Sequence, residues 1–264
     1  MPFARAGDLN VYYVEQGQGE PVLFVHGNWV TSTSWLPVLE RLPAGLRGIA
    51  PDVRGRGKTE GPDSGYTIPE LAQDLRAFVD ALGLDRFHLA AHSLGSAMAM
   101  QLALESPERV ISLTVLSPAW VDGMPEAYNA PAAQQALKDN IDIYAQALKM
   151  MMPTLPEGDL WRRLVDEGHE QRIEATLRNL PALLEWKPGD SLRQTGVPTL
   201  VVSGEHDPLT GGVNAHRAAQ ALGAEEVVIP GVGHSPNIEA PDRFVELLVG
   251  HVGAHGSTNS KSER

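Results

Sequence analysis

The chain has no cysteine among its 264 residues. This absence excludes disulfide bonds, thiolate metal ligands and a thiol nucleophile together. Positive charge is also scarce, because 21 lysines and arginines stand against 33 aspartates and glutamates, for a formal net charge of −12. A protein that binds a phosphate backbone needs a positively charged surface. We therefore expect no nucleic acid partner.

Long hydrophobic runs are missing as well. No apolar segment approaches the roughly 18 residues that a membrane span needs, and residues 1–7 contain no apolar stretch typical of a signal peptide. We therefore predict a cytoplasmic protein with no membrane partner. The acidic excess of charge is typical of a soluble protein.

Glycine and proline are abundant, with 26 and 20 residues, which is more than average usage would give. This surplus predicts an ordered domain with many turns. Between the turns, strand and helix patterns alternate. The segment 22–26 is continuously apolar, as in strands that are covered on both faces. Thr67-Ile68-Pro69-Glu70 has the form of a capping box at the start of a helix that Gly83 ends.

Further strands and helices follow the same alternation. The predicted strands are 9–15, 22–26, 48–53, 86–91, 110–116, 198–203 and 226–229. Helices are predicted between them, among others at 94–104, 214–222 and 241–248. Such alternation predicts an α/β fold, with a mostly parallel sheet of about eight strands and helices on both faces.

One connection is much longer than a crossover needs. In a sheet of about eight strands, one more than the seven located above, we take the strand 110–116 as the sixth. About 80 residues separate it from the next strand, whereas about a dozen would suffice. We predict that 118–192 forms a helical cap over the carboxyl edge of the sheet, where ligands bind in open α/β folds. The core domain is then 1–117 together with 193–250. The polar segment 251–264 is predicted to be a disordered tail.

A serine stands at one of the predicted strand–helix turns. Ala91-His92-Ser93-Leu94-Gly95 lies where the strand 86–91 passes into the helix 94–104. A serine on such a turn presents its hydroxyl above the sheet edge, and small residues two positions away on either side let the turn close. Ala91 and Gly95 meet that requirement. The alternative is an ordinary turn in which Ser93 caps the helix.

A serine nucleophile needs a base and a group that orients the base. Asp207 follows the predicted strand 198–203, and His234 follows the strand 226–229. Both residues therefore lie at the edge that presents Ser93, in the chain order serine, aspartate, histidine that sheets of this type use. Taken singly, each has a plainer interpretation, as a turn residue before Pro208 or as a loop histidine.

An oxyanion hole would complete such a site, with one backbone N–H from the residue after the nucleophile and one from an early strand–helix loop. Leu94 follows Ser93 and supplies the first. Asn28 lies in the loop after the strand 22–26 and supplies the second through its main chain. Its side chain is then free to contact the substrate.

Four segments give the chain a resemblance to a known family. They are His26-Gly27, Asp52-Val53-Arg54-Gly55-Arg56-Gly57-Lys58-Thr59, Ala91–Gly95 and Gly233-His234. With them, the chain resembles the α/β-hydrolase fold superfamily over about residues 8–250, including the helical cap of its smaller esterase-like members. The resemblance implies that Ser93 is the nucleophile, Asp207 the acid and His234 the base, with Asn28 and Leu94 as oxyanion donors.

The chain departs from the family pattern at three positions. Thr59 stands where the second segment normally has serine, Ala91 replaces the first glycine of the turn, and Ser96 stands where many relatives have glycine. The serine nucleophile argues against the haloalkane dehalogenase and epoxide hydrolase branches, which use aspartate there. Asp122 lies in a region where some relatives place the acid, and it is kept as a reserve acid.

These observations predict a carboxylic-ester hydrolase that acts on a small-molecule ester or lactone. No metal and no organic cofactor is required. The substrate pocket is expected to involve four residues: Trp29, His92, Trp120 and Tyr128. Nothing in the sequence decides the oligomeric state, so both a monomer and a homodimer stay open.

The same three residues support other chemistries. Hydrolysis of a carbon–carbon bond and perhydrolysis to a peracid need only a different pocket. A third possibility is a ligand receptor, in which a slow hydrolase uses its cap as a switch. Fast multiple turnover would favour an enzyme, whereas one slow acylation with a ligand-induced melting shift would favour a receptor.

Overall fold

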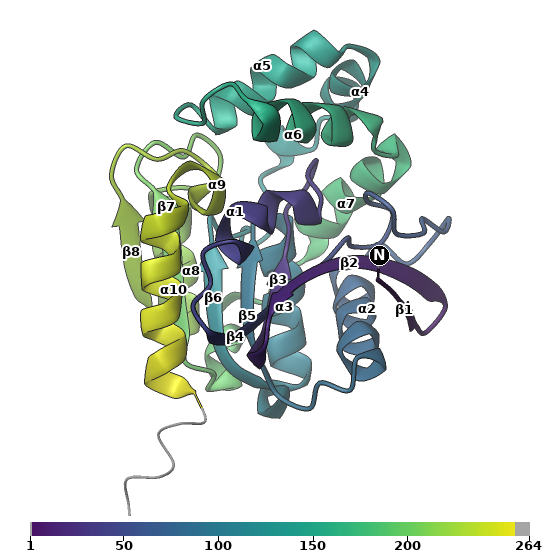
Figure 1. The fold of residues 1–264 in the computed structure, drawn as a ribbon. Helices are drawn as coiled ribbons and strands as arrows, with labels where there is room; N and C mark the ends of the chain where they lie inside the picture. The colour runs from purple at the N-terminus through teal and green to yellow at the C-terminus, as the bar shows by residue number, and fades with distance from the viewer. Residues whose placement is uncertain (1, 257–264) are drawn as a thin grey trace, which may run out of the picture.

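A computed structural model describes residues 2–256, which form an α/β structure around one sheet (Figure 1). The strands are β1 (Phe3–Ala6), β2 (Leu9–Gly17), β3 (Gly19–Val25), β4 (Gly45–Pro51), β5 (Phe87–His92), β6 (Val110–Leu116), β7 (Thr199–Gly204) and β8 (Glu225–Ile229). Their order in the sheet is β1-β2-β4-β3-β5-β6-β7-β8. The pairings from β4 to β8 are parallel, and those of β1 with β2 and of β2 with β4 are antiparallel. The predicted fold class and the mostly parallel sheet are confirmed.

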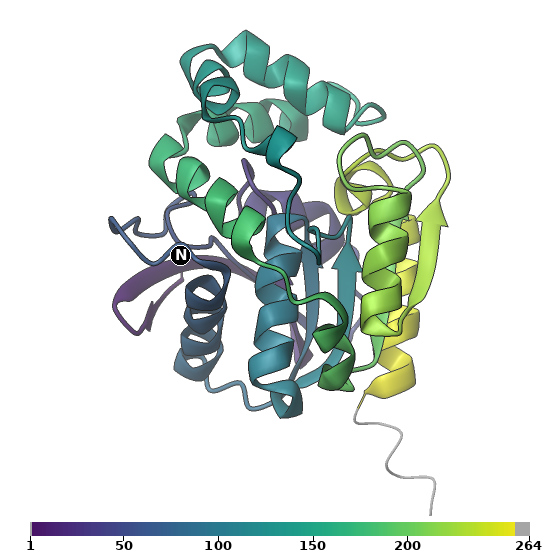
Figure 2. The same cartoon turned by 180° about the vertical axis from the view of Figure 1, so that it is seen from behind.

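Helices cover both faces of the sheet. Outside the long connection they are α1 (Leu36–Leu39), α2 (Ile68–Ala81), α3 (Leu94–Glu105), α8 (Val213–Leu222), α9 (Pro236–Glu239) and α10 (Pro241–His255). Helices α1 and α10 lie on the face turned to the viewer in Figure 1, and α2, α3 and α8 lie on the face seen in Figure 2. The sheet is therefore shielded from water on both sides, as its continuously apolar strands require.

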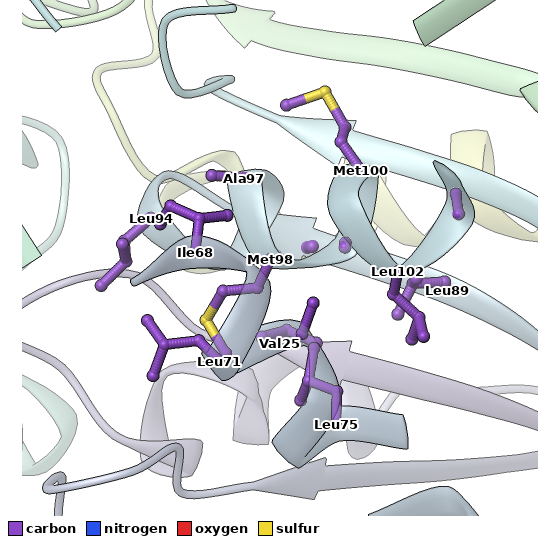
Figure 3. Close-up of a cluster of buried hydrophobic side chains, with 14 of the residues drawn as sticks. Val25, Ile68, Leu71, Leu75, Leu89, Leu94, Ala97, Met98, Met100 and Leu102 are labelled. Carbon is purple, nitrogen blue, oxygen red and sulfur yellow. The ribbon is translucent and has the colours of Figure 1, made fainter. Parts of the chain in front are cut away.

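The larger part of the core packs α2 and α3 against the sheet. Figure 3 shows Leu71 and Leu75 of α2 beside Met98 of α3 and Val25 of β3, and all four side chains are buried.

The start of α2 is fixed by the predicted capping box. The Thr67 hydroxyl accepts from the backbone N–H of Glu70, and the Glu70 carboxylate in turn accepts from the Thr67 N–H.

The opposite face is sealed by aromatic rings. Trp35 is fully buried, with its ring centroid 5.0 Å from that of Phe24 in β3 and 6.0 Å from that of Phe244 in α10. Contacts of this kind add to the burial of apolar area. The two cores hold β3, β5, β6 and β7 rigidly in register, so the loops at their carboxyl ends have fixed positions.

The long connection between β6 and β7 is helical. It contains α4 (Pro131–Asp139), α5 (Ile141–Met151), α6 (Asp159–Glu170) and α7 (Ile173–Glu185), which we call the inserted helices. Helices α4, α5 and α6 lie above the edge of the sheet at the top of Figure 1, and α7 runs down from them and joins the core of α2 and α3. Their own small core, including Tyr144, Leu148 and Leu164, packs against Val30 and Ile238 of the main domain. The inserted helices therefore rest on the loops that follow the strands.

Two terminal segments differ from the sequence-based expectation. Strand β1 was not predicted, because four residues that alternate in burial carry little signal. Helix α10 continues to His255, so the first residues of the predicted disordered tail are helical. Val252 is buried against the second core, and the His251 ring hydrogen-bonds the Pro198 carbonyl at 3.2 Å. Residues 257–264 of that tail lie outside the described residues.

Within residues 2–256, no helix is long and apolar enough to cross a membrane. The longest helix of that range, α10, has 15 residues, short of the roughly 20 that a span needs. The same part of the chain contains no cluster of three or more histidine, aspartate or glutamate side chains that could hold a metal ion.

Candidate active site

Ser93 occupies a strained turn between β5 and α3. Its φ of +52° lies in the left-handed region that few residues other than glycine adopt. The strain is held by two backbone hydrogen bonds, from Ser93 N–H to the Leu116 carbonyl at 3.0 Å and from Ser96 N–H to the Ser93 carbonyl at 2.8 Å. The Ser93 side chain makes no capping hydrogen bond to α3. This geometry argues against the plain helix-cap interpretation and leaves the hydroxyl available for chemistry.

Close backbone approaches around this turn require small residues. A Cβ on Gly95 would lie 2.5 Å from the His26 carbonyl oxygen and 2.6 Å from that of Val25. A Cβ on Gly27 would lie 2.9 Å from Nδ1 of His92 and 3.1 Å from Cβ of Ser93. The loop after β3 and the turn after β5 are therefore in direct contact. This close approach is possible only because both positions are glycine.

Asp207 and His234 form a hydrogen-bonded pair on the loops after β7 and β8. Nδ1 of His234 lies 3.0 Å from each carboxylate oxygen of Asp207, and the Asp207 side chain is fully buried. Because a carboxylate accepts hydrogen bonds, this contact places the proton on Nδ1 and leaves Nε2 as an acceptor. A histidine in this tautomer can take a proton from a serine hydroxyl.

The Asp207 carboxylate is held in its charged form. Burial alone would raise its pKa, but the attraction of His234 and the hydrogen bonds from His234, Thr210 and Leu209 hold the pKa well below its ordinary value. The backbone N–H groups of Leu209 and Thr210 donate to Asp207 Oδ1 at 2.9 and 3.0 Å, and the Thr210 hydroxyl donates to Oδ2 at 3.1 Å. Thr210 was not predicted as a site residue; the local signal for this turn is Asp207 itself, because an aspartate side chain often accepts from the backbone N–H two residues on.

The inserted helices support His234 through its backbone. The His234 N–H donates to the carbonyl of Met151, the last residue of α5, at 2.7 Å. A Cβ on the preceding residue, Gly233, would clash with that carbonyl and with Pro153. The position of His234 is therefore set by the main domain and by the inserted helices together.

His92 lies beside His234 as a neutral ring. It is buried, its Nε2 donates to the His234 carbonyl at 2.8 Å, and the two ring centroids are 4.8 Å apart. Burial, aided by the charge of His234, lowers the pKa of His92 to about 3. His92 was predicted to line the pocket; the structure gives its ring a hydrogen-bond partner in the backbone of His234, and its contact with a substrate stays a prediction.

The loop that carries Asn28 is tied to the loop after β4. His26 is fully buried, its Nδ1 donates to the Gly27 carbonyl at 2.8 Å, and its Nε2 accepts from the Val53 N–H at 3.1 Å. Burial lowers the pKa of His26 to about 4, although the attraction of Asp52 opposes this shift. Because both ring nitrogens are used by the neutral form, protonation would break the contact with Val53.

The remaining predicted residues lie in the loop after β3 and in the segment between β6 and α4. Trp29 has a φ of +59°, and its indole N–H donates to Gln134 of α4 at 2.6 Å. Its carbonyl accepts from the Tyr144 hydroxyl of α5 at 2.8 Å. Trp120 and Tyr128 stack on each other, with ring centroids 5.1 Å apart. Their exact contact with a substrate stays a prediction.

Asp122, the reserve acid, has a different partner. Its two carboxylate oxygens accept from Nε and Nη2 of Arg217 at 2.7 and 2.9 Å. Arg217 also donates to Asp190 at 2.8 Å, so it bridges the beginning and the end of the long connection. The structure brings His234 together with Asp207, whereas Asp122 serves an exposed ion-pair cluster.

Acid is expected to destabilise the protein through the two buried histidines. An unfolded chain protonates histidine at a pKa of about 6.5, whereas His26 and His92 have pKa values of about 4 and about 3 in the folded chain. Between these values the unfolded state binds more protons, so the free energy of unfolding falls as the pH falls from about 6.5 toward 4. Each histidine contributes at most about 1.4 kcal/mol per pH unit.

Urea denaturation at pH 7, 6 and 5 measures this dependence. In the His92→Gln variant, the amide N–H can still donate to the His234 carbonyl, but the titrating ring is gone. We expect its free energy of unfolding to fall less steeply with pH than that of the original chain. Equal slopes in the two proteins would contradict the prediction for His92.

The sequence of the chain matches a family model described as "Alpha/beta hydrolase family" over residues 22–247. Among curated proteins, "Putative carbamate hydrolase RutD" of Azorhizobium caulinodans is 29% identical, over 96% of this chain and 98% of the relative. These matches extend across the main domain and the inserted helices.

Solved structures show the same similarity in space. The structure of Est816, described as an N-acyl homoserine lactone degrading enzyme, is 30% identical with a TM-score of 0.81, over 94% of this chain and 99% of that one. The enol-lactonase from Burkholderia xenovorans LB400 is 24% identical with a TM-score of 0.82, over 96% of this chain and 100% of the other. At this lower identity, the second comparison shows the fold alone.

Proposed function

Because the chain belongs to the alpha/beta hydrolase family, we propose that it is a serine hydrolase that cleaves a small carboxylic ester or lactone through an acyl-enzyme intermediate. One observation carries the proposal. The buried Asp207–His234 pair lies at the sheet edge where Ser93 is held at a positive φ without a capping partner. A pair in which histidine Nδ1 donates to the carboxylate and Nε2 is the acceptor, at the same sheet edge as an uncapped serine, fits nucleophilic catalysis.

The first half of the proposed reaction forms the acyl-enzyme. Oγ of Ser93 attacks the substrate carbonyl carbon while its proton passes to Nε2 of His234. The charge on Asp207 stabilises the imidazolium that results. The negative charge on the carbonyl oxygen is stabilised by the backbone N–H groups of Asn28 and Leu94. When the tetrahedral intermediate collapses, the proton moves from His234 to the leaving alkoxide.

The second half repeats these steps with water. His234 removes a proton from the water molecule that attacks the acyl carbon, and then returns it to Oγ of Ser93 as the acid is released. In a lactone, the leaving alkoxide stays attached to the acyl group, so the product is a single hydroxy acid. The same residues can therefore act on linear esters and on lactones.

One comparison bears on the substrate class. The Est816 structure, at 30% identity, is described as degrading an N-acyl homoserine lactone. The enol-lactonase shares the fold. The RutD relative is named for a carbamate, which also offers a carbonyl with a heteroatom leaving group. Esters and lactones are therefore the first substrates to test, and a carbamate is the alternative substrate class.

The test combines a covalent probe with turnover measurements. A fluorophosphonate probe should add one adduct, which peptide mass spectrometry places on Ser93. The rate of hydrolysis of p-nitrophenyl butyrate should fall in proportion to the fraction of protein that is labelled. Ser96→Ala is the matched control, and its Ser93 should be labelled as in the original chain. Ser96 is a nearby serine whose hydroxyl donates to the Ser93 carbonyl at 2.6 Å, and we expect no adduct on it. Labelling of another residue, or hydrolysis that persists after full labelling, would overturn the proposal.

A further inference from the structure

Arg56 is a buried cation next to the loop after β3 that carries Asn28, which we call the oxyanion loop. Its side chain is fully buried, and in the described part of the chain it forms no ion pair with a carboxylate. Its partners are neutral oxygens: Nη1 donates to Thr176 at 2.5 Å and to Gln171 at 3.2 Å, and Nη2 donates to Oδ1 of Asn28. Burial lowers the pKa of Arg56 only to about 10, so the guanidinium stays charged at neutral pH.

The contact with Arg56 determines how the Asn28 carboxamide is oriented. A guanidinium has only donors, so the group that faces it must be the carbonyl oxygen of the amide. The amide nitrogen, Nδ2, then points away from Arg56. Asn28 is partly exposed, and within residues 2–256 no hydrogen bond holds its Nδ2. Nδ2 is therefore an oriented donor with no protein partner in that range.

We infer that Arg56 is a positioning residue that presents Nδ2 of Asn28 to the acyl group of the substrate. The inference rests on the proposed function, in which the backbone N–H of Asn28 meets the carbonyl oxygen. Nδ2 belongs to the same residue, so it can reach only atoms a few bonds from that carbonyl. The site should therefore favour acyl groups with a hydrogen-bond acceptor at the third position of the chain.

The inserted helices contribute to this arrangement. Gln171 directly follows α6 and Thr176 lies in α7, so two residues of the long connection hold Nη1 of the guanidinium while Asn28 accepts from Nη2. Arg56 thus connects three parts of the chain: the oxyanion loop, the loop after β4 and the inserted helices. An arginine that only joined these parts of the fold would make the same contacts. The test must therefore separate a structural role of Arg56 from its role in positioning Asn28.

A matched pair of esters makes this separation. p-Nitrophenyl methoxyacetate and p-nitrophenyl butyrate have the same leaving group and similar acyl size, but only the first has an oxygen at the third position. The measured quantity is the ratio of their kcat/KM values. The variants are Asn28→Ala, which keeps the backbone N–H, Arg56→Met, and the double variant.

We expect the ratio to fall about tenfold in Asn28→Ala, as the loss of one hydrogen bond implies. It should fall by a similar factor in Arg56→Met, and no further in the double variant, because Arg56 acts through Asn28. Should Arg56→Met fail to fold, Arg56→Lys replaces it, with a smaller fall in the ratio, because an ammonium can still donate to Oδ1 of Asn28 but lacks the fixed geometry of the guanidinium. Arg172→Ala is the matched control: this arginine also connects the inserted segment to the main domain, through the Gly61 carbonyl at 3.2 Å, and its removal should leave the ratio unchanged.

Two results would overturn the inference. One is an unchanged ratio in Asn28→Ala, and the other is a double variant in which the two single effects multiply. Ser93→Ala distinguishes these failures from a failure of the proposed function. If Ser93→Ala still hydrolyses both esters, the proposed function is wrong; if it hydrolyses neither, an unchanged ratio contradicts only the role of Asn28 and Arg56.

Discussion

Ser93→Ala is expected to lower kcat for hydrolysis of p-nitrophenyl butyrate by roughly a millionfold. Losses of about this size follow when the nucleophile of a hydrogen-bonded serine, histidine and acid is removed. The backbone donors of the oxyanion hole remain, so a weak residual rate above that in water should persist. Steady-state kinetics at saturating ester, with protein purified away from host esterases, measures the loss.

The stability of this variant separates chemistry from folding. Ser93→Ala keeps Cβ, and the φ of +52° stays strained, so its thermal unfolding should match that of the original chain. Ser93→Gly should be equally inactive, while its backbone accepts a positive φ without strain. A Ser93→Ala preparation that stays well folded and keeps more than about a thousandth of the activity would exclude Ser93 as the nucleophile.

Asp207→Asn is expected to lower kcat by about ten-thousandfold. Asparagine can still accept hydrogen bonds from the N–H groups of Leu209 and Thr210, so the loop should keep its shape. Its amide N–H, however, would donate to Nδ1 of His234 and force the proton onto Nε2. In that tautomer His234 cannot accept the proton of Ser93, and this change alone has an effect of that size in serine hydrolases.

Asp122→Asn is the matched control for the acid. It removes a carboxylate that pairs with Arg217 on the surface, where ion pairs contribute about 1 kcal/mol or less. Its kcat should therefore be close to that of the original chain. The opposite result, with a large loss in Asp122→Asn and a small loss in Asp207→Asn, would assign the acid role to Asp122.

Short-range sequence signals predicted the parts of the site that depend on local chemistry. The turn around Ser93 needs small residues at fixed offsets, and the chain order of Ser93, Asp207 and His234 follows from the sheet. The structure brings Asp207 and His234 within hydrogen-bond distance. The parallel sheet could be predicted for the same reason, since each buried strand is a continuous apolar run with turn residues at its ends.

Contacts between distant segments could not be predicted in this way. Arg56 and Thr176 are 120 positions apart, and nothing local indicates that Arg56 is buried while its neighbour Arg54 pairs with Asp74. The extension of α10 is a similar case. The glycines and histidines in its last turns favour an earlier end of the helix, but burial of Val252 against the sheet outweighs their low helix propensity.

The hydrogen bond from His234 to Met151 restricts how this fold can be altered. The backbone of the proposed base is fixed by a carbonyl at the end of α5, and α5 belongs to the long connection between β6 and β7 rather than to the main domain. Exchange of the inserted helices for those of a relative, as a way to change the substrate, would also remove this support. A chimaera must therefore retain the α5 end and Gly233 as one unit, or it will gain a new pocket and lose the geometry of its base.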